Sequence, residues 1–190
     1  MNHRIYQALL ENSRVPIIIV HGPAGTGKTM MACQAASASQ RHDRVIMTRP
    51  AVSVDEQHGF LPGNLNKKMD PWIAPMTDYL RVPKQKKIEV CPLAYMRGRT
   101  FDHSWILADE MQNSTPNQMR MVLTRLGRDS KLVIMGDTGQ HDRGFEKNGL
   151  LDLVTRLTYS PIPGIEVLKF TDEDIKRHEI IKDILRLYGP

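Results

Sequence analysis

Residues 22–29 have the types and spacing of a loop that wraps a phosphate group. The segment fits the pattern G-x-x-x-x-G-K-[ST] and consists of Gly22, Pro23, Ala24, Gly25, Thr26, Gly27, Lys28 and Thr29. Glycines permit the tight turn that points backbone N–H groups at a phosphate. The lysine ammonium can bind phosphate oxygens, and the hydroxyl of the last residue can bind Mg²⁺. We therefore predict that this loop binds a nucleotide, with Thr29 as a metal ligand.

The sequence around the loop supports this prediction. A β-branched run over residues 15–20 precedes it, and a helix-compatible segment over residues 30–36 follows it. A phosphate-binding loop requires this order of strand, loop and helix. The alternative, a glycine-rich turn without a nucleotide, does not explain the order.

Two adjacent acids form the second candidate site. Asp109 and Glu110 follow the apolar run 105–108. Because consecutive residues at a strand end diverge, the two carboxylates can have different tasks. Asp109 is suited to hold Mg²⁺, directly or through water, and Glu110 to polarise an attacking water as a general base. The alternative is a pair of surface acids in front of a helix.

A third polar segment, residues 136–140, ends another apolar run. In parallel sheets, ligands collect at the carboxyl ends of the strands. Gln140 is therefore placed to donate a hydrogen bond to the γ-phosphate or to orient water, and so to distinguish ATP from ADP. Asp137 is expected to support the metal indirectly.

The remaining pattern indicates which elements position these residues. Runs that are apolar throughout, typical of parallel strands covered on both faces, occur at 15–20, 44–48, 104–108, 131–135 and 165–169. Helix starts are indicated at Thr115, before a proline, and at Thr171, before three acids. The latter predicts a C-terminal helix. The alternation predicts a three-layer α/β fold with a mainly parallel central sheet flanked by helices.

Residues 50–103 interrupt this alternation. They contain turn signals, a predicted amphipathic helix around residues 65–80 and an irregular segment over 83–92. An insertion of this size between core strands is usually functional. We expect one domain over residues 1–190, with an insertion-like segment at about 50–103.

Composition limits the class of protein. With 190 residues, 41% hydrophobic and 25% charged, the chain is typical of a soluble globular domain. Apolar runs such as 17–20 are too short to span a bilayer, so no membrane partner is expected. Two isolated cysteines, Cys33 and Cys91, indicate a reducing compartment. The net charge of +5 favours either a polyanionic partner or a solvated basic face, and charge alone does not separate these.

Together these motifs resemble the PhoH-like family of RecA-like P-loop NTPases, which is related to superfamily 1 helicases. The resemblance covers nearly the entire chain. Beyond the phosphate loop it is carried by segments 48–52, 59–63, 92–100, 109–113, 123–127 and 174–178. The resemblance implies an ATP-binding and ATP-hydrolysing protein, with ATP and Mg²⁺ as cofactors and a link to RNA or single-stranded DNA.

The chain also departs from the family pattern. Relatives usually carry a glutamine upstream of the loop that reads adenine, and by spacing this place falls near His3, whereas Gln7 is too close to the loop. Met111 stands where alanine is common, and residues 140–144 differ from the commoner form. We expect no appended RNA-binding or nuclease domain, and therefore no nuclease activity.

The resemblance further implies a site completed by a second subunit. Superfamily 1 helicases place ATP between two RecA-like domains, and this chain has room for one. Hydrolysis would then require an arginine in trans, worth ~10³ or more in rate in comparable systems. Such an arginine implies a homo-oligomeric ring, with a hexamer as one candidate. The candidates are Arg97, Arg99, Arg143 and Arg177. We favour Arg99 and Arg177, which match family segments, although either could form an internal ion pair instead.

Two residues are candidates for nucleic-acid contacts. Arg49 follows the second predicted strand, where helicase relatives contact the strand backbone. Phe60 could provide a stacking platform or a wedge, or alternatively a buried anchor for the insertion.

The leading prediction is a Mg²⁺-dependent ATPase that couples hydrolysis to the remodelling of RNA or single-stranded DNA. The alternative is a nucleotide-dependent assembly or binding module with little turnover. A small-molecule kinase is a weaker third possibility, since no acceptor pocket or arginine-rich lid can be identified. We expect a cytoplasmic location, in a bacterium or in the host cell of a phage that encodes the protein.

Overall fold

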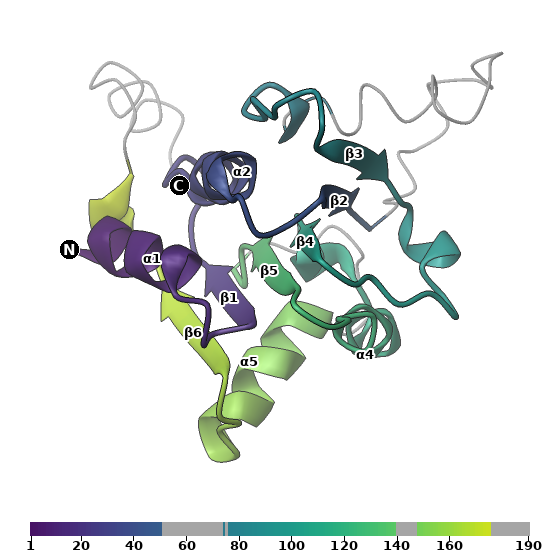
Figure 1. The fold of residues 1–190 in the computed structure, drawn as a ribbon. Coiled ribbons are helices and arrows are strands. Elements are labelled where there is room, and N and C mark those ends of the chain that lie inside the picture. The colour runs from purple at the N-terminus through teal and green to yellow at the C-terminus, as the bar shows by residue number, and fades with distance from the viewer. Residues whose placement is uncertain (51–73, 75, 140–147, 176–190) are drawn as a thin grey trace, which may run out of the picture.

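The computed structural model describes residues 1–50, 74, 76–139 and 148–175. In this part of the chain, one sheet contains six strands in the order β3-β2-β4-β5-β1-β6, and every pair is parallel (Figure 1). The strands are β1 (Ile17–His21), β2 (Arg44–Thr48), β3 (Lys87–Val90), β4 (Ser104–Ala108), β5 (Lys131–Gly136) and β6 (Ile165–Lys169). The described helices are α1 (Asn2–Glu11), α2 (Lys28–Ala38), α4 (Pro116–Leu123) and α5 (Gly149–Tyr159).

Helices cover both faces of the sheet, as the predicted three-layer architecture requires. Figure 1 shows α1 and α2 on one face and α4 and α5 on the other. Side chains along β1 alternate between the two cores: Ile18 and Val20 pack with α1 and α2, whereas Ile17 and Ile19 pack with α4 and α5. The predicted fold class is therefore confirmed.

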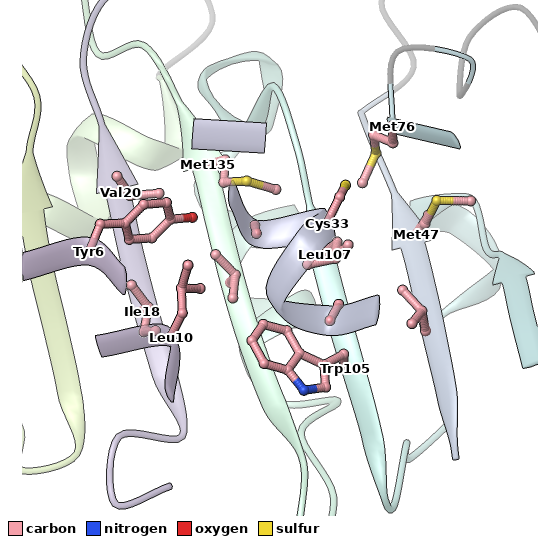
Figure 2. Packing of buried hydrophobic residues seen from close by; sticks show 14 of the residues in the cluster. Tyr6, Leu10, Ile18, Val20, Cys33, Met47, Met76, Trp105, Leu107 and Met135 are labelled. Carbon is pink, nitrogen blue, oxygen red and sulfur yellow. The ribbon is translucent and has the colours of Figure 1, made fainter. Parts of the chain in front are cut away.

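The core beneath α1 and α2 is shown in Figure 2. Tyr6 and Leu10 of α1 and Cys33 of α2 are buried against strand residues, among them Val20, Leu107 and Met135. Burial of such side chains stabilises a fold by about 1.5–3 kcal/mol each. The layer holds α1 and α2 against the strands whose ends carry the predicted site.

The continuous apolar runs all form strands, and the two edges of the sheet differ from its centre. β1, β4 and β5 are buried at every position, because they have neighbours on both sides and helices on both faces. β3 was not predicted. Its sequence Lys-Ile-Glu-Val alternates and is partly exposed, which suits an edge strand inside the segment that the sequence indicated as irregular.

Helix starts were predicted with mixed success. Thr115 and Gln118 form a reciprocal capping box at the start of α4. Thr171 and Asp174 also form a capping box, but it closes a single 3-10 turn (Asp172–Asp174), and Ile175 is extended. The predicted helix therefore does not start at this cap, and residues 176–190 lie outside the described part. In the helix predicted over 65–80, residues 65–73 and 75 also lie outside the described part of the chain, while Met76 and Thr77 are helical.

No described helix is both long and apolar enough to cross a lipid bilayer.

Candidate nucleotide-binding site

A cavity of about 470 Å³ lies where four neighbouring strands end. The order of the sheet places the carboxyl ends of β2, β4, β5 and β1 next to one another. Each contributes to the lining: Arg49 follows β2, Asp109 and Glu110 follow β4, Gly136 ends β5 and Asp137 follows it, and residues 24–30 follow β1. The predicted phosphate loop, the predicted acids and Asp137 thus share one cavity.

The phosphate loop has the backbone that its glycines were expected to provide. Gly22, Gly25 and Gly27 have φ values of 138°, 81° and 85°, which side-chain-bearing residues rarely adopt. Gly22 is also crowded, because a Cβ there would lie 2.3 Å from the carbonyl oxygen of Phe170. This close approach joins the loop to the residue that follows β6.

Lys28 is held inside the loop by its ammonium group. Its Nζ donates to the carbonyl oxygens of Gly22 and Pro23, both at 2.7 Å, and to Thr26 Oγ1 at 3.2 Å. Burial lowers the pKa of Lys28, while the nearby carboxylates of Asp137, Asp109 and Glu110 raise it. A cation surrounded by acids and oxygen acceptors in this loop is suited to phosphate oxygens.

Thr29 and Asp109 form a pair of oxygen ligands at the mouth of the loop. Thr29 Oγ1 donates to Asp109 Oδ1 at 3.1 Å. Burial and the adjacent Glu110 raise the pKa of Asp109 to about 6, whereas Arg49 and the Thr29 hydroxyl act in the opposite direction. A hydroxyl and a carboxylate are ligands that Mg²⁺ accepts, so these two residues fit the predicted metal site.

Glu110 has an unusual backbone and several partners. Its φ of 53° and ψ of 35° place it in the left-handed region, where a residue with a side chain is strained. Arg49 Nη2 lies 3.5 Å from Glu110 Oε1, and Gln112 Nε2 donates to Glu110 Oε2 at 2.5 Å. The two adjacent carboxylates thus have different partners: Asp109 accepts from Thr29, whereas Glu110 contacts Arg49 and Gln112.

Arg49 therefore lies within the nucleotide cavity, beside the predicted general base. Its predicted contact with nucleic acid stays a prediction. Gln112 is a residue to which sequence reasoning gave no role, although it belongs to the family segment 109–113. Its position two residues after Glu110 could have indicated a role, because a tight turn there returns the side chain to the end of β4.

His3 reaches the cavity from the N-terminal helix. Its Nε2 lies 2.9 Å from the Thr26 carbonyl oxygen, which can only accept, so this nitrogen carries the proton. The hydroxyl of Tyr6, one turn later in α1, donates to the carbonyl oxygen of Lys28 at 3.3 Å. Helix α1, which was not predicted, thus supports the loop and places His3 in the lining of the cavity. That His3 stands near the adenine-reading position stays a prediction.

The other predicted residues lie elsewhere. Arg99 does not line the cavity: its Nη1 donates to Glu89 Oε1 at 2.5 Å, and its guanidinium lies 4.5 Å from the centre of the Phe101 ring. It has the internal ion pair that was the alternative to a role in trans. Arg97 lines a second cavity, between residues 93–97 and α4. Phe60, Gln140, Arg143 and Arg177 lie outside the described residues.

A parallel α/β sheet, a phosphate loop between β1 and α2, and an acid pair at the end of β4 define a nucleotide-binding protein of the P-loop class. The PhoH-like protein family matches residues 1–189. The chain belongs to this family.

Individual relatives agree with this assignment. The chain is 40% identical over 203 residues to a PhoH-like protein of Bacillus subtilis, covering 99% of this chain and 62% of the relative. It is 41% identical over 181 residues to a PhoH-like protein of Synechocystis (88% and 55% covered) and 37% identical over 190 residues to Protein PhoH of Escherichia coli (91% and 53% covered). The chain therefore spans just over half the length of these relatives.

Proposed function

We propose that this protein is a Mg²⁺-dependent ATPase that couples hydrolysis to binding or remodelling RNA or single-stranded DNA. One observation carries the proposal: the cavity brings Lys28, Thr29, Asp109 and Glu110 together from two separate segments of the chain. A phosphate loop alone would serve binding. The second acid supplies what hydrolysis needs in addition, a base for water.

Each residue has a task in this proposal. Lys28 exchanges its loop carbonyls for the β- and γ-phosphate oxygens, and the loop N–H groups bind the same phosphates. Thr29 and Asp109 would hold Mg²⁺, which neutralises charge on the phosphates when bound. Glu110 accepts the proton of the attacking water. Burial around Lys28 and Asp109 strengthens these electrostatic interactions.

The nucleic-acid and assembly parts of the proposal rest on the family and on charge. The net charge of +5 favours a polyanionic partner. Arg49 follows β2 and contacts Glu110, so a nucleic-acid strand bound at this arginine would lie close to the proposed base. A neighbouring subunit in a ring would supply an arginine to the γ-phosphate. Arg99 would have to leave Glu89 for this task, and Arg177 remains the other candidate.

A second function is favoured by a specific contact. Arg49 Nη2 lies 3.5 Å from Glu110 Oε1, so the base is engaged by a cation. If a partner must release it, the protein alone would act as a nucleotide-dependent assembly or binding module with little turnover. We propose a cytoplasmic location for either function, since Cys33 and Cys91 are free thiols.

Phosphate release from Mg·ATP tests the proposal. It should be measured with and without poly-RNA and single-stranded DNA at low salt. We expect release that increases with one polymer and falls about 10²–10⁴-fold in Glu110→Gln, because the base is lost while the phosphate loop is intact. Lys28→Ala should also be inactive, and Lys84→Ala, at an exposed lysine, is the matched control. ATP binding without turnover under all conditions would favour the binding module.

A further inference from the structure

A buried glutamine joins the ends of β4 and β5. Gln112 is 1% exposed and lies in the 3-10 turn Met111–Asn113, directly after the acid pair. Its Oε1 accepts a hydrogen bond from the backbone N–H of Asp137 at 3.1 Å, and its Nε2 donates to Glu110 Oε2 at 2.5 Å. Because a backbone N–H can only donate, the amide has one orientation, with its NH₂ group toward Glu110.

We infer that Gln112 is a positioning residue that aims the Glu110 carboxylate at the attacking water and ties it to the segment that follows β5. The inference rests on the proposed ATPase function. The side chain of Glu110 is 41% exposed and lies 3.5 Å from Arg49, so without the shorter bond to the buried amide its rotamer would be held less tightly. A base must lie within hydrogen-bond reach of the proton that it abstracts, and a buried amide can hold it there.

The end of β5 is shaped around this amide. A Cβ at Gly136 would lie 2.5 Å from Gln112 Oε1 and 2.7 Å from Leu150 Cδ2. A glycine at position 136 therefore leaves the room that the Gln112 side chain occupies. The same strand end provides the Asp137 N–H that fixes the amide, so a shift of residues 136–137 would be transmitted to Glu110 through Gln112.

Two variants separate the parts of the interaction. Gln112→Glu keeps an acceptor for the Asp137 N–H and, when ionised, offers no donor to Glu110 and repels it, so it is assayed at a pH above the shared titration of the two acids. Gln112→Leu removes both bonds at similar volume. We expect kcat for Mg·ATP to fall about tenfold to a hundredfold in both, with an unchanged KM, because the base is misplaced while the phosphate loop is intact. Gln34→Leu, at an exposed glutamine of α2, is the matched control and should match the unmodified protein.

A double variant distinguishes positioning from a structural role. In the Glu110→Gln background, Gln112→Leu should cause no further fall in single-turnover hydrolysis and no change in ATP affinity, because there is no base left to aim. A further fall, or weaker ATP binding, would show a structural role and overturn the inference. So would a Gln112→Glu variant with unreduced kcat in an active protein. Absence of release above the Lys28→Ala background would instead refute the ATPase function itself, and the inference with it.

Discussion

Thr29 Oγ1 and Asp109 Oδ1 lie 3.1 Å apart, although 80 positions separate the two residues in the chain. The sheet brings them together. β5 lies between β1 and β4, so the first turn of α2 and the end of β4 meet across one strand. The relationship assembles the proposed metal site from two motifs that are each incomplete alone.

Loss of the Thr29 hydroxyl should weaken the use of Mg²⁺. We expect Thr29→Val to raise the Mg²⁺ concentration needed for half-maximal hydrolysis and to lower kcat by about tenfold or more, because a ligand is replaced by a methyl group. Titration of Mg²⁺ at saturating ATP measures both. Thr29→Ser restores the hydroxyl and should recover the loss, while Thr158→Val, on the exposed side of α5, controls for the substitution itself. An unchanged titration in Thr29→Val would remove this residue from the metal site.

Gly22 should not tolerate a side chain. In Gly22→Ala the new Cβ would meet the Phe170 carbonyl oxygen at 2.3 Å, on a backbone with φ of 138°. We expect a loss of about 2–4 kcal/mol in the free energy of unfolding, together with weaker ATP binding. Gly98→Ala is a matched control, since its φ is 78° and no atom lies within 4 Å of its Cβ. Backbone strain alone should cost it about 1–2 kcal/mol. Urea titration of both variants makes the comparison, and equal losses would contradict the predicted clash.

Arg49 should connect polynucleotide binding to Glu110. We expect Arg49→Ala to reduce the salt dependence of single-stranded RNA binding by about one unit of slope and to abolish stimulation of hydrolysis by the polymer. Fluorescence polarisation across a salt series measures the slope. Arg41→Ala removes an equal charge at an exposed position and serves as the control. If the slope is unchanged in Arg49→Ala, this arginine acts on the nucleotide alone.

His42 should make stability depend on pH. Its Nδ1 lies 2.9 Å from Trp105 Nε1, which can only donate, so the ring accepts there and must be neutral. Burial, with Lys86, Arg41 and Lys131 nearby and Asp43 opposing them, lowers its pKa from 6.5 to about 4. The unfolded chain therefore binds a proton first as the pH falls. The stabilisation is present above about pH 6.5 and is lost between there and about pH 4.

Replacement of this histidine tests that dependence. His42→Asn places an acceptor near the Nδ1 position but does not titrate. Between pH 6.5 and 4 the unmodified protein should lose on the order of 1–2 kcal/mol more stability than the variant, a figure reduced from the full shift because the ring is partly exposed. Urea unfolding at several pH values provides the measurement. Parallel pH profiles for the two proteins would exclude His42 as the origin.

Local sequence patterns were sufficient for the phosphate loop, five strands and the cap of α4. These features depend on neighbouring residues: glycines at positive φ, β-branched runs and a capping threonine before proline. β3 and α1 were missed for the opposite reason. Lys87–Val90 becomes a strand because β2 offers an edge with which it can pair. Helix α1 is fixed by contacts with the phosphate loop and with β5. In the latter, Lys131 Nζ of β5 donates hydrogen bonds to three carbonyl oxygens in the last turn and C-cap of α1.

The sequence by itself determined the candidate residues for binding phosphate, holding a metal and activating water, because that choice depends on residue type and short spacing. Only the tertiary structure decided which of them meet. It placed Arg49 on Glu110, joined Glu110 to Asp137 through Gln112, and paired Arg99 with Glu89 outside the cavity. The physical reason is that strand order is set by packing of the whole sheet. Strands distant in the chain become neighbours, and their ends bring side chains together that no local pattern relates.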